Sequence, residues 1–393
     1  MFMRHNHFRD GARKAVNILY VFPEPLPLPR ARGIQVAHTV AALAQDAVTV
    51  SLAYVPSENK ANPLAAYGVE PPRGLELVPF SRGLPAPFSW LPVHSNQLFF
   101  RRLRRWLKQE SRERGGPALI MARHLKIAHA LIEQCPDIPL LYEAHEVFAD
   151  VAPPDKRESL ARIEDTVLRR AAALVAVTHG VADDLKKRYR LDREIHVLPD
   201  AVSWPAHIPE KPWRDAGRHI IYAGSFFPWK GVQDLVAAAE WLPGCRIELI
   251  GGSPERIREY QRQVPANGAE VVFAGHLPHT ETLKALSAAC IAVLPNRAEP
   301  NSLWSSPLKL FEYMAAGCAV VAADLPSVRE VLAEDEAVWA APGDPETLAA
   351  GIRRLVKHPE QARRMGERLR ERARNHTWEA RAEKLLAIMR ALV

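Results

Sequence analysis

The chain has 393 residues, a length that fits two domains, and 48% of them are apolar, which excludes a largely disordered protein. The formal charge of +7 is spread over a long chain, so it does not indicate nucleic acid and suits anionic small ligands or acidic lipid equally well. The four cysteines form no Cys-x-x-Cys pair, so we expect reduced cytoplasmic thiols in place of a zinc site or a disulfide framework.

The first part of the chain places basic residues before a short apolar run, as a signal peptide does. No small-residue cleavage site follows, and we predict a first β-strand at 16–22. No stretch approaches the roughly 18 uninterrupted apolar residues of a membrane span. We therefore expect a cytoplasmic protein.

Apolar runs alternate with amphipathic stretches along the rest of the chain. Between the predicted strands we place helices, for example at 35–45, 157–172 and 232–241. Continuous apolar strands with intervening helices indicate parallel sheets that are covered on both faces. At 199–218 a proline-rich polar stretch interrupts this alternation and is typical of a linker between domains.

The predicted fold is therefore α/β, with two doubly wound domains that face each other across a cleft. We place them at 1–200 and 201–375, with an additional C-terminal helix at 376–393 that crosses back to the first domain. In such sheets, ligands bind beyond the carboxyl ends of the strands.

The basic stretch between Phe99 and Arg114 has the pattern of an amphipathic helix with aromatic residues. A helix of this kind can lie on an anionic membrane. The alternative is an ordinary surface helix whose apolar face packs into the core. Because the positive charges are confined to one helix, we expect no binding of nucleic acid.

His145 follows a predicted buried strand in YEAHEVF, at the edge where ligands are expected. It could donate to a substrate hydroxyl or transfer a proton. A structural histidine is the alternative. Gly33, in RGIQVAH, is predicted to open a helix after the first strand, where a glycine lets the backbone approach a ligand. It belongs to no dinucleotide fingerprint, because GxGxxG is absent.

Lys230 lies at a strand-to-helix turn in IYAGSFFPWKGVQDL. The stretch resembles a P-loop only superficially, because Gly231 follows the lysine and Val232 stands where a P-loop has Ser or Thr. A lysine at this place can still neutralise a phosphate. A solvated lysine near a helix start is equally compatible with the pattern.

The stretch SSPLKLFEYMAAG predicts a helix of about three turns. Ser306 suits its N-cap, Pro307 its first helical position, and Gly317 the residue just past its end. Its start offers free N–H groups to an anion, and Lys309 in the first turn is unfavourable unless an anion is near. Glu312 follows one turn later on the same face. These groups suit a sugar nucleotide, with a well-capped structural helix as the alternative.

Taken together, these stretches resemble the family-4 retaining glycosyltransferases, which have the GT-B fold of two Rossmann-like domains. The strongest match is SSPLKLFEYMAAGCAVVAADLPSVREVL, and the resemblance covers almost the whole chain. YAGSFFPWKGVQDLVAA, VVFAGHLP, IAVLPN and AAPGDPETLAAGI occur in the family's order, and RGIQVAH and YEAHEVF are similar to its acceptor-side motifs.

The resemblance implies transfer of a sugar from a UDP- or GDP-linked donor to a hydroxyl acceptor, which could be a glycan, a lipid-linked sugar or a small molecule. It implies retention at the anomeric carbon, no metal, and no cofactor besides the donor. A sugar-nucleotide 2-epimerase on the same fold and a non-catalytic pseudo-transferase subunit are the alternatives.

The resemblance also assigns roles on the donor side. Lys230 is expected to contact the donor diphosphate, and Ser306, Pro307 and Leu308 to offer it backbone N–H groups. Glu312 is expected to hold the ribose hydroxyls.

Four further residues take roles from the resemblance. Gly275 and His276 are expected to meet the nucleobase, and Gly33 to lie near the diphosphate from the side of the first domain. His145 matches the histidine beneath the donor sugar.

Trp304 departs from the family pattern, because relatives have a glutamate there that touches the donor sugar, eight residues before Glu312. Glu299 or Asn301 could substitute for it. Because of this departure, the identity of the donor sugar is not predicted, and the pseudo-transferase subunit remains an alternative.

Two other departures concern charge. Ser225 follows Gly224 where the family has an arginine, so one cation of the diphosphate site is missing, and Lys309 could supply it. Ser225 stays among the expected donor-binding residues. At the linker, Asp200 and Ala201 replace the usual Asn-Gly pair.

Overall fold

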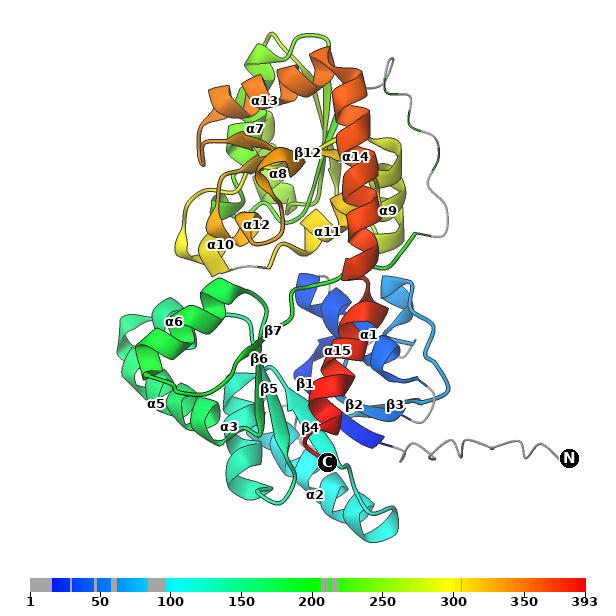
Figure 1. The fold of residues 1–393 in the computed structure, drawn as a ribbon, viewed down its shortest axis with the longest axis vertical. Coiled ribbons are helices and arrows are strands. Elements are labelled where there is room, and N and C mark those ends of the chain that lie inside the picture. The colour runs from blue at the N-terminus through cyan, green and yellow to red at the C-terminus, as the bar shows by residue number, and fades with distance from the viewer. Residues whose placement is uncertain are drawn as a thin grey trace, which may run out of the picture.

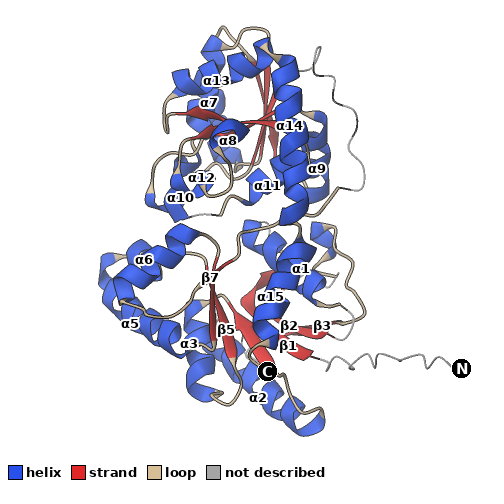
Figure 2. Cartoon of the chain, in the orientation of Figure 1, coloured by secondary structure: helices blue, strands red, loops and turns tan. Residues whose placement is uncertain are grey.

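The computed structural model describes residues 16–28, 30–45, 48–57, 62–83, 96–205, 209, 211, 213, 218–304 and 306–393, with the side chain of Asn301 left out. The protein consists of two α/β domains stacked end to end (Figure 1). In both, a sheet is covered by helices on its two faces (Figure 2). The predicted α/β class with parallel sheets is confirmed.

The sheet of the first domain is parallel throughout the described residues, with the order β3-β2-β1-β4-β5-β6-β7. β1 is longer than predicted because the register shifts after Phe22 and lets Pro25 and Leu26 pair with β2. The strands are β1 (Val16–Leu26), β2 (Val48–Pro56), β3 (Leu75–Pro79), β4 (Leu119–Ala122), β5 (Leu140–Ala144), β6 (Ala173–Ala176) and β7 (His196–Val197).

The sheet of the second domain is also parallel where it is described, with the order β10-β9-β8-β11-β12-β13. The order reverses between β8 and β11, which makes it doubly wound. Its strands are β8 (His219–Ala223), β9 (Arg246–Ile250), β10 (Glu270–Gly275), β11 (Ile291–Leu294), β12 (Ala319–Ala323) and β13 (Val338–Ala340).

The predicted helices are present, with ends shifted by a few residues. The helices of the first domain are α1 (Ala31–Leu43), η1 (Ala65–Tyr67), α2 (Asn96–Glu113), α3 (Leu125–Gln134), α4 (Phe148–Val151), α5 (Pro154–Arg170) and α6 (His179–Tyr189). Those that follow are η3 (Pro228–Lys230), α7 (Val232–Ala238), η4 (Ala239–Trp241), α8 (Pro254–Gln261), α9 (His279–Ala288), α10 (Pro300–Trp304), α11 (Leu308–Ala315), α12 (Pro326–Arg329), η5 (Glu334–Glu336), α13 (Pro345–Lys357), α14 (Pro359–Ala373), η6 (Arg374–His376) and α15 (Trp378–Arg390).

The last helix, α15, packs on the first domain beside α1, although α14 packs on the second (Figure 1). Its apolar residues Trp378, Leu385 and Met389 are buried in the core of the first domain. The Trp378 ring stacks on His38 of α1, with 5.5 Å between ring centroids. The chain therefore returns to the first domain after completing the second.

The carboxyl ends of both sheets meet at the domain interface. Thr178, after β6, donates from Oγ1 to the carbonyl of Trp304 at 3.3 Å. The Glu330 carboxylate accepts from the N–H groups of His179 at 2.7 Å and Gly180 at 2.9 Å, at the start of α6. The edges where the sequence predicts ligand binding thus face each other.

Candidate functional site

The start of α11 differs from the prediction. Ser306 does not cap the helix, because its Oγ accepts a hydrogen bond from Asp200 N at 3.0 Å, across the domain interface. Pro307 is the N-cap residue and not the first helical residue, and as a proline it has no N–H group to offer an anion. Leu308 N donates to the Ser306 carbonyl at 3.0 Å. The predicted serine cap and the role of Pro307 as a donor are therefore wrong.

The body of α11 is also shorter than predicted, since Leu308–Ala315 makes about two turns. Gly317 lies just past its end with a φ of 67°, as predicted for a C-terminal glycine.

Lys309 projects from the first turn of α11 toward the carboxyl end of β8. Its Nζ donates to the Tyr222 hydroxyl at 2.9 Å and lies 4.1 Å from the centre of that ring. Burial lowers the pKa of Lys309 to about 7. Gly224, which follows β8, has a φ of 153°, a conformation that favours glycine, and a Cβ there would meet the end of the Lys309 side chain.

Lys230 ends η3, and its Nζ lies 3.6 Å from the centre of the Trp229 ring. Burial, and next the positive charge of Lys309, hold the pKa of Lys230 well below its ordinary range. Gly231 then turns the chain into α7 with a φ of 66°, so close to Pro295 that a Cβ would clash with its carbonyl. Two lysines therefore crowd one edge of the second sheet, an arrangement that an anion would stabilise.

Ser225 lies in the same loop and is exposed, and its carbonyl accepts from the Tyr222 hydroxyl at 2.8 Å. Ser225 and Lys230 of this loop and Lys309 of α11 thus lie near the same strand end, as the prediction of a donor site requires.

Glu312 is buried on the next turn of α11. Its Oε1 lies 2.8 Å from His279 Nε2 at the start of α9. Burial opposes protonation of His279, but the hydrogen bond and the charge of Glu312 raise its pKa above the ordinary value. The sequence analysis missed His279, which carries no motif signal beyond its place shortly after β10.

His279 also reaches the first domain. Its ring meets that of His38 edge to face, with 6.0 Å between centroids. Burial, and next the charge of His279, lower the pKa of His38 to about 4, so this ring stays neutral. His38 Nδ1 lies 3.1 Å from the Ser203 hydroxyl. The Glu312 carboxylate is therefore connected to the other side of the domain interface.

Gly275 and His276 lie where β10 ends and the chain turns toward α9. Gly275 has a φ of 70°, and no described atom lies within 4 Å of where its Cβ would be. His276 is exposed. The contact of this pair with a nucleobase stays a prediction.

Gly33 is the third residue of α1, which begins at Ala31, so it does not open the helix as predicted. A Cβ at this position would clash with the Tyr67 hydroxyl and the Leu28 carbonyl. The close approach that requires glycine here is thus made by the chain itself.

Trp304 connects the two domains. Its Nε1 donates to the Asp184 carboxylate on α6, and its carbonyl accepts from Thr178. Asn301 lies in the same helix, α10, and its side chain is outside the described residues. Glu299 precedes α10 and is half-buried. Trp304 therefore joins the end of α10 to the first domain.

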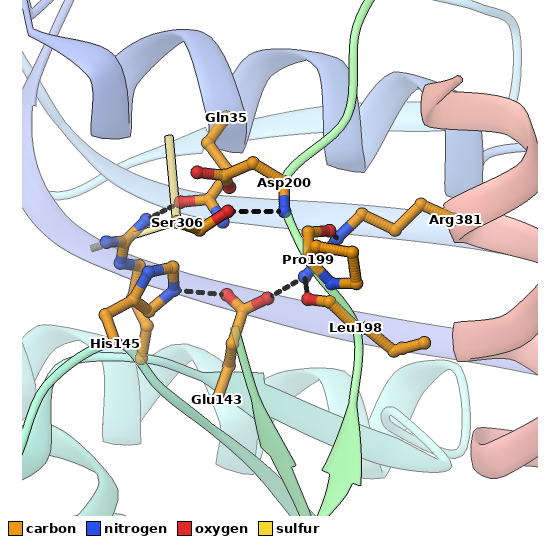
Figure 3. Close-up of polar contacts among 9 residues, drawn as sticks. Gln35, Glu143, His145, Leu198, Pro199, Asp200, Ser306 and Arg381 are labelled. Atoms are coloured by element: carbon orange, nitrogen blue, oxygen red, sulfur yellow. Dashed lines mark hydrogen bonds and ion pairs between the residues drawn. The ribbon is translucent and has the colours of Figure 1, made fainter. Parts of the chain in front are cut away.

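His145 follows β5 and is half-buried, with Nε2 2.9 Å from Glu143 Oε2 (Figure 3). Burial lowers its pKa to about 4, although the neighbouring Glu143 acts in the opposite direction. The ring is therefore neutral near pH 7 and can accept or donate one proton.

The helix α2 has its apolar side in the core of the first domain, where Phe99 and Leu103 are buried. The apolar side thus packs into the core, as the alternative requires, and Phe99 is not available to a membrane, while a membrane contact of the basic side stays a prediction. The opposite side is exposed and basic, with side chains at helical spacing: Arg101, Arg105, Lys108 and Arg112. No described helix is long and apolar enough to span a membrane.

Two family profiles match the chain: Glycosyltransferase Family 4 over residues 33–203 and Glycosyl transferase-like over residues 230–387. The alpha-maltose-1-phosphate synthase of Mycolicibacterium smegmatis is 30% identical over 257 residues, which is 58% of this chain and 65% of the synthase. The match thus spans just under two thirds of that relative's length.

Solved structures resemble almost the whole chain. Sucrose-phosphate synthase from Thermosynechococcus elongatus gives a TM-score of 0.71 at 20% identity, over 96% of this chain and 99% of that one. Anabaena Alr3699/HepE in complex with UDP-glucose gives 0.68 at 14% identity, over 95% and 99%. At these identities the likeness shows a shared fold.

Proposed function

This chain belongs to glycosyltransferase family 4 and has the two-domain GT-B fold, and from that premise we propose that it is a retaining glycosyltransferase. It moves a sugar from a nucleotide-sugar donor to a hydroxyl acceptor. The observation that carries the proposal is the pair of crowded lysines, Lys230 and Lys309, one turn of α11 away from the buried Glu312.

The two lysines bind the donor diphosphate. Burial lowers the pKa of both lysines, and the charge of Lys309 lowers that of Lys230 further, so a doubly charged diphosphate would stabilise both ammonium groups. Lys309 supplies the cation that relatives carry at the position of Ser225. The amide groups of Ser306 and Leu308 lie at the same end of α11.

Glu312 holds the ribose hydroxyls, and Gly275 and His276 meet the base. The Anabaena relative was solved with UDP-glucose, which makes a uridine nucleotide the first donor to test. His279 occupies one oxygen of Glu312 and leaves the other carboxylate oxygen for the ribose.

In the proposed reaction, the acceptor hydroxyl attacks the anomeric carbon from the face that the diphosphate leaves. The bond from that carbon to the diphosphate oxygen breaks, and a phosphate oxygen takes the proton of the acceptor. Charge that grows on the leaving diphosphate is stabilised by Lys230 and Lys309, which are already in place. By family resemblance, the reaction needs no metal and no cofactor besides the donor.

We place the reaction in the cytoplasm, with the basic side of α2 against an anionic membrane. In Figure 1, α2 lies at the end of the first domain away from the second, so this contact leaves the domain interface accessible. Replacement of Arg101, Arg105, Lys108 and Arg112 by glutamine should abolish flotation with phosphatidylglycerol vesicles while transfer to a soluble acceptor continues. Flotation that persists would contradict the membrane contact.

The test of the transferase proposal is a screen of UDP- and GDP-sugars by thermal shift, followed by product analysis with and without acceptors. A ligand that binds only the folded chain raises its melting temperature. Glu312→Ala should abolish the shift with the true donor, because the ribose hydroxyls lose the carboxylate that holds them, whereas the exposed Glu158→Ala on α5 should keep it. A chain that alters no nucleotide sugar would support the pseudo-transferase alternative, and a 2-epimer formed without acceptor would support the epimerase.

A further inference from the structure

Glu143 lies beneath the domain interface, one residue before the end of β5, and is 1% exposed. Its carboxylate joins two partners from distant parts of the chain. Oε2 meets His145 Nε2 at 2.9 Å, and Oε1 pairs with Arg381 Nη2 (Figure 3). The histidine assigned to the sugar is thus connected to the C-terminal helix through one buried acid.

Arg381 comes from the first turn of α15 and is itself buried. Its Nε donates to the Pro199 carbonyl at 2.8 Å, and its Nη2 lies 3.4 Å from the Leu198 carbonyl. Two carbonyls of the segment that follows β7 therefore fix the guanidinium group, which leaves it little freedom to move away from Glu143.

The charges around Glu143 keep it ionised. Burial raises the pKa of Glu143, but Arg381, then His145 and Arg123, more than offset this effect and lower it below the ordinary range. The other titratable groups that face this cluster are Tyr20 on β1 and Asp200 after β7. An ionised carboxylate can only accept hydrogen bonds, so the proton between the two residues belongs to His145 Nε2.

The ring of His145 then has one defined tautomer. With the proton on Nε2, the Nδ1 atom of the neutral ring is its acceptor for a substrate hydroxyl. Without Glu143, either nitrogen could carry the proton and the ring could rotate. A buried ion pair is seldom the most stable choice for such a place, since apolar residues of similar size are often as stabilising.

We propose that Glu143 and Arg381 are positioning residues that fix the orientation and the tautomer of His145, which makes α15 a working part of the active site. This inference rests on the proposed function only where it assigns His145 to the sugar. Arg381 acts through Glu143, and Glu143 acts through His145.

The first test needs no activity. In the wild-type chain labelled with 15N in its histidines, the His145 signal, assigned by its loss in His145→Gln, should report a proton on Nε2 alone. In the double variant Glu143→Leu with Arg381→Met, it should report a mixture of both tautomers. Lys384→Met, which removes an exposed charge from the same helix, should behave as the wild type. An unchanged tautomer in the double variant would overturn the proposal.

The second test measures transfer. In the double variant kcat should fall about 10-fold to 100-fold, as when an acid that orients a functional histidine is removed. The melting-temperature shift with the donor nucleotide should remain, because Lys230 and Glu312 are untouched. Arg381→Lys should recover part of the rate.

The pH profile separates positioning from damage to the fold. Arg381→Met leaves Glu143 buried without its main counter-charge, so the pKa of Glu143 rises into the working range. The activity of this variant should fall as the pH is lowered, and the double variant should lack this acid limb. Equal losses at every pH in both variants would indicate a purely structural role.

The two proposals fail separately. If the wild-type chain transfers no sugar but the histidine signals respond as described, the proposed function is wrong and the positioning role stands. If the wild-type chain transfers sugar and the His145 tautomer is unchanged when Glu143 and Arg381 are replaced, the positioning role is wrong and the proposed function stands.

Discussion

Two charge pairs, one half-buried and one buried, lie on opposite sides of the domain interface, and they are built in opposite ways. In the second domain, Lys230 and Lys309 bring like charges together, and both pKa values are lowered. In the first domain, Glu143 and Arg381 bring opposite charges together, and the acid is held ionised. Among the described residues neither lysine forms an ion pair, so a ligand can bring the counter-charge, whereas Glu143 and Arg381 already pair with each other. Neighbouring like charges therefore indicate a site that binds an oppositely charged ligand. A pair of opposite charges indicates residues that hold other side chains in position.

The largest effect on the transfer rate is expected from the replacement of Lys230. Lys230→Met should lower kcat about 100-fold to 1,000-fold, as does the loss of one preorganised electrostatic contact to a transition state. The ligand-free chain should not lose stability, because the variant removes a charge that both desolvation and the neighbouring Lys309 disfavour. Steady-state rates and melting curves check both parts, with the exposed Lys357→Met as the control. A large fall in melting temperature would make Lys230 a structural residue.

A smaller effect is expected from Lys309, whose pKa of about 7 makes it a pH reporter. Since this pKa lies below the unfolded value, the ligand-free chain should gain stability from Lys309 as pH rises from about 7 toward 10. A bound diphosphate favours the charged form, so UDP binding near pH 8 should take up protons.

Calorimetry in buffers of different ionisation enthalpy measures this uptake. The number of protons taken up should be smaller in Lys309→Met. The transfer rate of this variant should fall about 10-fold. Ser225→Arg added to Lys309→Met should recover part of the rate, because it restores the cation of the relatives. No recovery and an unchanged uptake would place the diphosphate elsewhere.

The smallest effect is expected on the free energy of unfolding, from His279 and Glu312. These two residues carry opposite charges, and Glu312 also has to bind the ribose. His279 has a raised pKa, so the pair contributes stability that is fully present below about pH 6.5 and is lost as pH rises through the folded pKa. His279→Gln should cost roughly 1–2 kcal/mol at pH 6 and less at pH 9. Melting curves at both pH values, with the exposed His276→Gln as the control, measure the difference. An equal cost at both values would mean that His279 is not charged.

Much of the fold could be predicted from the sequence because buried parallel strands need continuous apolar residues. The run that contains Ile18 and Tyr20 is fully buried on both sides and reads as a strand without any partner in view. The turn at Lys230 and Gly231 between β8 and α7 was likewise placed correctly, because an apolar run followed by glycines and a proline marks the end of a strand.

What escaped prediction depends on residues far apart in the chain. Ser306 has the local features of a cap, but Asp200, more than a hundred residues away, takes its hydroxyl. Arg381 and Glu143 are separated by 238 positions, and neither lies in a motif that hints at the other. Phe99 suits a membrane or a core equally well until the sheet beneath it is known.

The two passages of the chain between the domains lie side by side. Val202 pairs with Thr377, Val202 N donates to the His376 carbonyl at 2.9 Å, and Trp378 N donates to the Val202 carbonyl at 3.3 Å. The domains are therefore joined by two adjacent backbone segments that bond to each other, so a movement of one segment must carry the other with it.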